Sequence, residues 1–180
     1  MKLSPIIHFT KNGKEVIIRH ANENDAANLL ELKLSYIRNT TSLPLYEHEY
    51  KNDIRTEKDL ISRYISEANS ILLVAEHGNN LIGNIDLTGN QRKKLFHTGM
   101  VGMGIANEWH NLGIGSMLME SALTWAISSP LSIAWLEVYS TNKAGYRLYE
   151  KFGFEECGTI KNFFQEVIPA DKITMVKYLK

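Results

Sequence analysis

The chain has 180 residues, of which 44% are hydrophobic and 22% charged, and this composition is typical of a globular domain rather than a disordered, collagen-like or membrane-embedded chain. A chain of this length can bury one sizeable core, so we expect a single domain over residues 1–180. The only cysteine, Cys157, excludes an internal disulfide. Twenty basic and twenty acidic residues cancel, which argues against nucleic acid or an anionic membrane as partner.

Neither a signal peptide nor a membrane span is expected. The first thirty residues contain only the short apolar patch Pro5-Ile6-Ile7, whereas a signal peptide needs an apolar stretch of about 7 to 15 residues. The longest apolar run, Ile71–Ala75, is far shorter than the roughly 20 residues of a membrane-spanning helix. We therefore expect a cytoplasmic protein.

Hydrophobic periodicity and turn residues predict a mixed α/β chain of the α+β type. In chain order, the expected elements are a strand at 16–19, a helix at 22–38, an irregular segment at 40–53, a helix at 56–68, strands at 71–76 and 81–87, a strand at 96–106, a helix at 114–127, a strand at 133–138, a helix at 142–152, and strands at 156–166 and 173–179. A capping pair, Thr56 and Asp59, opens the second helix, and Gly78-Asn79-Asn80 forms the turn of a hairpin. No repeat or linker indicates a second domain.

The most informative segment, residues 103–117, runs from a glycine-containing strand through a turn directly into a helix. The free N–H groups and the dipole of a helix N-terminus favour anions, and Gly113 and Gly115 leave the backbone open to a phosphate. The alternative is that these glycines only form a tight turn. Two standard phosphate motifs are absent: there is no Walker sequence, and Leu118 replaces the third glycine of a dinucleotide-binding fingerprint.

Two motifs together resemble the GNAT superfamily of N-acetyltransferases. His110-Asn111-Leu112-Gly113-Ile114-Gly115 is similar to the acyl-CoA signature (Q/R)-x-x-G-x-(G/A), with His in the place of Gln or Arg. The segment 136–154 is similar to the strand–helix pattern L-E-V-x-x-x-N-x-x-A-x-x-L-Y-E-K-x-G-F, with Gly145 where Ala is usual. The segment 153–159 further resembles the branch that acetylates amino acids and phosphinothricin. The resemblance implies a twisted, mostly antiparallel sheet of about seven strands with about four helices.

The resemblance also implies acetyl-CoA as co-substrate, without a metal. The residues that it assigns to acetyl-CoA are Met103, Gly104 and Ile105 on the strand, His110, Asn111, Leu112, Gly113, Ile114, Gly115 and Ser116 in the turn and first helical residues, and Asn142 and Tyr149. The strand amides would hold the pantetheine arm, and the turn would bind the pyrophosphate. Asn142 is also suited to be a plain helix cap.

Acetyl transfer to an amine needs a neutral nucleophile and a proton for the departing thiolate. Tyr149 matches the general acid of the family. Glu137 lies twelve residues earlier, a spacing similar to that of the ribosomal-protein N-acetyltransferases, in which such a glutamate takes the amine proton through water. Asp86, on the preceding hairpin, is the other candidate base, and an α-amine of pKa about 8 needs less help than a lysine amine.

The resemblance implies that the acceptor contacts Tyr36–Asp53 and Lys161–Lys172, which carry acidic side chains among aromatic ones; a plain solvated loop is the alternative for these segments. This composition suits a cationic amine with an apolar body. Arg38, Arg55 and Arg63 are candidates for the carboxylate of an amino acid.

A small amine or amino acid, a protein N-terminus, and a non-catalytic acyl-CoA sensor all stay open as functions, as does a homodimer. The basic run Arg92-Lys93-Lys94 is too small for nucleic-acid binding.

Overall fold

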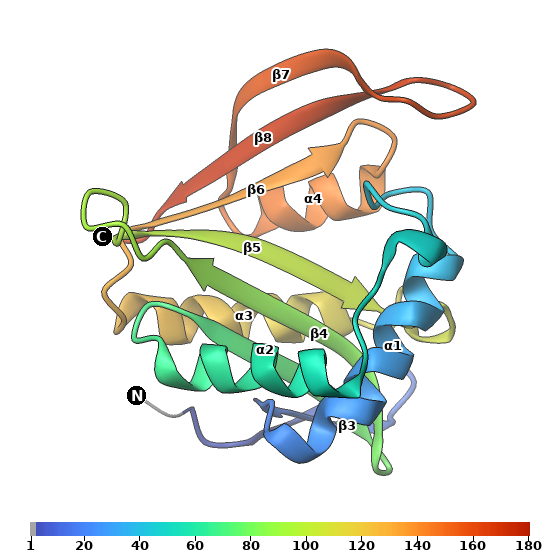
Figure 1. Cartoon of the computed structure of the whole chain (residues 1–180), viewed down its shortest axis with the longest axis vertical. Helices are drawn as coiled ribbons and strands as arrows, with labels where there is room; N and C mark the ends of the chain where they lie inside the picture. Colours follow the sequence, from blue (N-terminus) through green and yellow to red (C-terminus); the bar gives the residue numbers. More distant parts are fainter. Residues whose placement is uncertain (1–2) are drawn as a thin grey trace.

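Figure 1 shows the computed structural model, which describes residues 3–180 as a single twisted sheet with helices on both faces. The strand order is β1-β2-β3-β4-β5-β6-β8-β7. The strands are β1 Ile6–Phe9, β2 Glu15–His20, β3 Ile71–His77, β4 Asn80–Gly89, β5 Thr98–Ile105, β6 Ile133–Tyr139, β7 Glu155–Phe164 and β8 Ala170–Tyr178. Among these residues β5 and β6 are parallel, and every other neighbouring pair is antiparallel.

The helices divide between the two faces of the sheet. They are α1 Ala26–Arg38, α2 Ile54–Ser66, α3 Ile114–Ile127 and α4 Lys143–Lys151, with short 3-10 turns η1 Glu23–Asp25, η2 Glu47–Glu49 and η3 Asn107–Trp109. Successive strand residues point to opposite faces. In β4, Asn84 accepts a hydrogen bond from Tyr36 of α1 at 3.2 Å, whereas Gly83 lies against Leu118 of α3. We call these two sides the α1/α2 face and the α3 face.

The predicted mixed, mostly antiparallel fold is confirmed, and the sheet has eight strands where about seven were expected. The additional strand is β1, which is paired with β2 from Ile6↔Ile18 to Phe9↔Glu15. This apolar patch is too short for a signal peptide and was not expected to form a strand. A four-residue strand at a sheet edge carries too little periodicity to be recognised without its partner.

The start of α2 was also wrong. The capping residue is Asp53, whose Oδ1 accepts the backbone N–H of Thr56 at 2.8 Å, and the helix begins at Ile54. The Thr56 hydroxyl itself donates to the same oxygen at 2.7 Å, so Thr56 supports this cap instead of forming one with Asp59. Asp and Thr are both common N-cap residues, so only the backbone geometry shows whether Asp53 or Thr56 caps the helix.

The main core lies between the sheet and the helices on both faces and includes Ile18, Leu29, Ile61, Leu73, Ile85, Leu118 and Leu136. A second, small cluster of Tyr139, Phe164 and Ala170 lies apart from it, where β6 meets the hairpin of β7 and β8. Within residues 3–180, no helix is long and apolar enough to cross a membrane.

Candidate active site

The sheet opens between β5 and β6. The two strands pair only from Thr98↔Ile133 to Met100↔Trp135, while β5 remains paired with β4 as far as Ile105↔Gly83. The β5 edge that faces β6 therefore has no strand partner beyond Met100. Figure 1 shows β5 and β6 diverging from this point. An extended ligand could lie there and bond to the unpaired backbone groups, as a strand would.

The turn between β5 and α3 is shaped to receive an anion. Asn111 and Gly113 both have positive φ, at 61° and 97°, and Gly113 is the N-cap residue of α3. The first backbone hydrogen bonds of the helix run from Ser116 and Met117 to the carbonyl of Gly113, at 3.0 and 3.2 Å. The amides from Asn111 to Gly115 have no backbone partner within the described chain. Donors of this kind at a helix N-terminus are the usual protein partners of phosphate.

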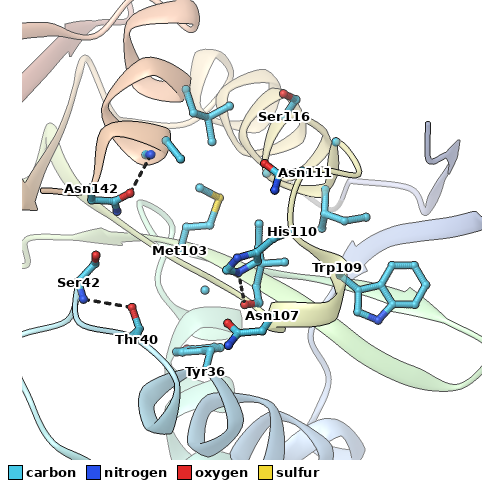
Figure 2. Close-up of a pocket in the computed structure, with 18 of the residues that line it drawn as sticks. Tyr36, Thr40, Ser42, Met103, Asn107, Trp109, His110, Asn111, Ser116 and Asn142 are labelled. Carbon is cyan, nitrogen blue, oxygen red and sulfur yellow. Dashed lines mark hydrogen bonds between the residues drawn. The ribbon is translucent and has the colours of Figure 1, made fainter. Parts of the chain in front are cut away.

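His110, which replaces the Gln or Arg of the signature, lies across the turn. Its Nε2 donates to the carbonyl of Ile105 at 3.0 Å, so the imidazole connects the turn to the end of β5. In Figure 2 the ring lies between Met103 and Asn107. The side chain is exposed. In this conformation its role is to shape the turn, and the anion would be held by backbone amides.

Helix α4 forms the opposite wall. Asn142 caps it, with Oδ1 accepting the N–H of Gly145 at 2.9 Å, so the cap interpretation of Asn142 is correct. A Cβ on Gly145 would come within 2.7 Å of the Asn142 side-chain amide nitrogen, so the two residues are in close contact. Figure 2 shows Asn142 facing Met103 across the pocket.

These elements enclose a cavity of about 480 Å³. All the sequence-predicted cofactor residues except Leu112 line it. Leu112 packs against the core instead, and its carbonyl accepts the N–H of Lys11 at 3.3 Å. Among residues 3–180, no group of three or more His, Cys, Asp or Glu is placed to hold a metal ion.

The sequence analysis missed Lys11, which also lines the cavity. It lies in the turn between β1 and β2, next to the glycine turn that precedes α3. No sequence signal could have found this lysine, because the hairpin that carries it was not expected. It brings a positive charge to the same wall as the free amides.

Tyr149 lines the cavity from α4, packed edge-on against Phe154 with ring centroids 6.1 Å apart. Its hydroxyl has no hydrogen-bond partner among the described residues. Burial raises the pKa of Tyr149 to about 12, because the phenolate would be poorly solvated. The hydroxyl is therefore protonated at physiological pH, on a residue that lines the space a ligand would fill.

Glu137 lies outside this cavity, on the α1/α2 face of β6. Its Oε1 accepts from Lys172 Nζ of β8 at 2.8 Å, and about a third of the Glu137 side chain is exposed. Cross-strand partners point to the same face of the sheet, and Met100 of β5 is the partner of Trp135 of β6. Every second residue of a strand keeps that face, so Glu137 lies on the same side of the sheet as Gly102 and Gly104 of β5. Glu137 thus borders the opening between β5 and β6 from the side opposite α3.

Asp86 also lies on the α1/α2 face, beside Gly102. Its Oδ2 accepts hydrogen bonds from the hydroxyls of Tyr64 at 3.1 Å and Thr88 at 2.9 Å. Its Oδ1 would be 2.8 Å from a Cβ on Gly102. Burial raises the pKa of the Asp86 carboxyl, and the two hydroxyls oppose this shift. Both candidate bases are therefore on the same face of the sheet.

The segment between α1 and α2 covers part of the site and is anchored by a buried carboxylate. Glu57 of α2 is fully buried, and its Oε2 accepts from Lys33 Nζ at 2.8 Å. Its Oε1 accepts from Asn52 at 2.9 Å and from the Tyr50 hydroxyl. These contacts hold the end of the segment, whose beginning supplies Thr40, Ser42 and Leu43 to the cavity wall.

The three arginines considered for a substrate carboxylate do not reach the site. Arg38 pairs with Glu47 on the surface, Arg63 lies over the ring of Tyr64, and Arg55 is exposed. None of them lines the cavity. Lys172, which the sequence analysis noted only as the end of an acceptor segment, is instead the cation beside Glu137.

A sequence model of the acetyltransferase (GNAT) family matches residues 34–154. The chain is 25% identical over 155 residues to the L-amino acid N-acetyltransferase AaaT of Escherichia coli, covering 83% of this chain and 88% of that protein. It is 27% identical over 121 residues to the probable N-acetyltransferase san of Drosophila melanogaster, covering 64% of each chain. The structure superposes on the GNAT-family acetyltransferase of Streptococcus pneumoniae with a TM-score of 0.89 and 28% identity, over 92% of this chain and 99% of that one.

Proposed function

Since this chain belongs to the acetyltransferase (GNAT) family, we propose that it transfers an acetyl group from acetyl-CoA to a primary amine of a small molecule or amino acid, by direct attack in a ternary complex. Residues 1–180 would form one catalytic domain. The observation that carries the proposal is the cavity that joins the open edge of β5, the unpaired amides before α3 and the hydroxyl of Tyr149.

The residues fit acetyl-CoA in three respects. The amides from Asn111 to Gly115, with Lys11 nearby, would bind the pyrophosphate. The open edge of β5 would pair with the pantetheine arm and polarise the thioester carbonyl. The Tyr149 hydroxyl would then lie near the sulfur, at the point where α4 borders the cavity.

The reaction forms a C–N bond and breaks the C–S bond, and the proton that leaves the amine balances the one that the thiolate takes up. Glu137 or Asp86 would accept the amine proton, directly or through water, on the α1/α2 face. Tyr149 would donate to the sulfur from the α3 face. A phenol of pKa about 12 is a weak acid, but a thiolate leaving into the same enclosed space is also more basic than in water.

A protein N-terminus is the second candidate acceptor, and 28% identity over 97 residues to N-alpha-acetyltransferase 50 of Danio rerio favours considering it. A third possibility is an acyl-CoA sensor without turnover. The Tyr149 hydroxyl supports catalysis over this alternative, because it has no hydrogen-bond partner among the described residues and belongs to a cavity-lining residue, whereas a ring that only packs would need no hydroxyl.

The test is an amine panel assayed with acetyl-CoA by release of the CoA thiol, using the wild type and Tyr149→Phe. The substitution keeps the ring and removes the proton, so kcat with the best amine should fall by about 10² to 10⁴ while acetyl-CoA affinity stays the same. Calorimetry with CoA measures the affinity. Full turnover by the variant would make Tyr149 a packing residue, and binding without turnover for every amine would favour the sensor.

A further inference from the structure

The ion pair of Glu137 and Lys172 connects β6 to β8 on the α1/α2 face of the sheet. Lys172 Nζ and Glu137 Oε1 are 2.8 Å apart, and the Lys172 side chain is only 14% exposed. The cross-strand partner of Lys172 is Tyr139, and a partner points to the same face of the sheet. Tyr139 and Glu137 are two positions apart on β6 and share a face, so both charges lie on the α1/α2 face. The pair therefore borders the open end of the split between β5 and β6.

Aromatic rings hold the lysine in place. Lys172 Nζ lies 4.2 Å above the ring of Phe163, which packs edge-on against Phe164 at 5.1 Å. Phe164 in turn stacks on Tyr139 of β6 with ring centroids 3.6 Å apart. The cation is thus fixed between an aromatic face and a carboxylate, with little side-chain freedom left to lose on binding a ligand.

Glu137 and Lys172 carry one negative and one positive charge close together, as the carboxylate and ammonium groups of an α-amino acid do. A partly enclosed ion pair contributes little to stability, because desolvation offsets most of the attraction, so its presence is poorly explained by the fold alone. A zwitterion could replace the internal partners one for one, placing its ammonium on Glu137 and its carboxylate on Lys172. An amine without an adjacent carboxylate would leave Lys172 without a new partner.

We propose that Glu137 and Lys172 together bind the α-ammonium and α-carboxylate of a free amino acid, which makes that class, and not a peptide N-terminus, the acceptor. The inference rests on the proposed acetyl transfer and narrows its substrate. It gives Glu137 two successive tasks at the same amine: binding the ammonium and then accepting its proton. Lys172 acts as a specificity-determining residue, since only a substrate with a free carboxylate uses it.

The experiment compares the twenty proteinogenic amino acids with their α-amides, which keep the side chain and amine but lose the carboxylate charge. CoA release from acetyl-CoA is measured for the wild type, Lys172→Gln, Lys172→Arg and Lys177→Gln. Lys177 is a matched control on the same strand, since its partner Ala134 places it on the opposite face. The readout is kcat/KM for each acid divided by kcat/KM for its amide, compared between the wild type and each variant at the same pH.

We expect the wild type to prefer the acids, and Lys172→Gln to reduce the acid-to-amide ratio by about 10- to 100-fold, the scale of a hydrogen bond to a charged group. Lys172→Arg and Lys177→Gln should keep the preference. The inference is overturned if wild-type ratios are near one, if Lys172→Gln leaves them unchanged, or if short peptides are better substrates than free amino acids; acetyl transfer itself would still stand. If no acid, amide or peptide releases CoA above the rate without amine, the inference fails, and the wider amine panel then decides whether the proposed acetyl transfer stands.

Discussion

A carboxylate placed at the N-cap of α3 should weaken the binding of acetyl-CoA at a modest cost to the stability of the fold. Gly113 has a φ of 97°, and a Cβ there would meet nothing closer than Met117 Cε at 3.7 Å. A side chain at this position therefore extends into the cavity. The left-handed backbone costs an L residue about 1 to 2 kcal/mol, least for Asn and Asp, so the matched substitutions are Gly113→Asp and Gly113→Asn.

The two variants have the same shape and differ in one charge. Two like charges about 4 Å apart repel by about 1 kcal/mol in water and about 4 kcal/mol near a protein surface. Gly113→Asp should accordingly bind acetyl-CoA about 5- to 1000-fold more weakly than Gly113→Asn. The helix dipole has the opposite effect on stability, because it favours the negative side chain, so the Asp variant should unfold at an equal or higher temperature than the Asn variant.

Isothermal titration calorimetry with acetyl-CoA measures this difference, and thermal unfolding followed by circular dichroism controls for the fold. The gap in affinity should narrow at 1 M salt, where charges are screened within about 3 Å. Equal dissociation constants for the two variants at low salt would refute the reasoning, because they would mean that no phosphate lies at this turn.

Three further outcomes are expected. His110→Ala should weaken acetyl-CoA by no more than about 1 to 2 kcal/mol, because its Nε2 is bonded to Ile105 and amides would hold the phosphates; calorimetry showing a much larger loss would make the imidazole a principal ligand. Glu137→Gln should lower kcat/KM most on the acidic side of the pH profile, with the deficit shrinking as pH approaches the pKa of the amine, and a deficit that does not change with pH would indicate positioning instead of proton transfer. Asp86→Asn should stabilise the protein increasingly as pH rises, because the folded-state pKa of Asp86 is raised and the wild type loses stability relative to the variant as pH climbs through that value. Chemical denaturation at several pH values measures the difference in unfolding free energy, and a difference that does not change with pH would contradict this.

The sequence alone determined the elements whose signals are local. Gly113 and Gly115, in the step from strand to helix, predicted an anion-binding turn, because free amides at a helix N-terminus follow from covalent geometry. Asn142 predicted its own cap, which the structure shows as the N-cap of α4. Such features depend on residues a few positions apart, so one chain suffices to read them.

Tertiary structure alone decided the features that depend on pairing between distant segments. Strand β1 has too few residues to show a period, and only its pairing with β2 identifies it and brings Lys11 to the cavity. The partner of Glu137 is Lys172, 35 positions along the chain, and their contact results from the register of β6 against β8. A one-residue slip in that register would move one of the two charges to the opposite face of the sheet, and no local pattern in the sequence encodes which register is adopted.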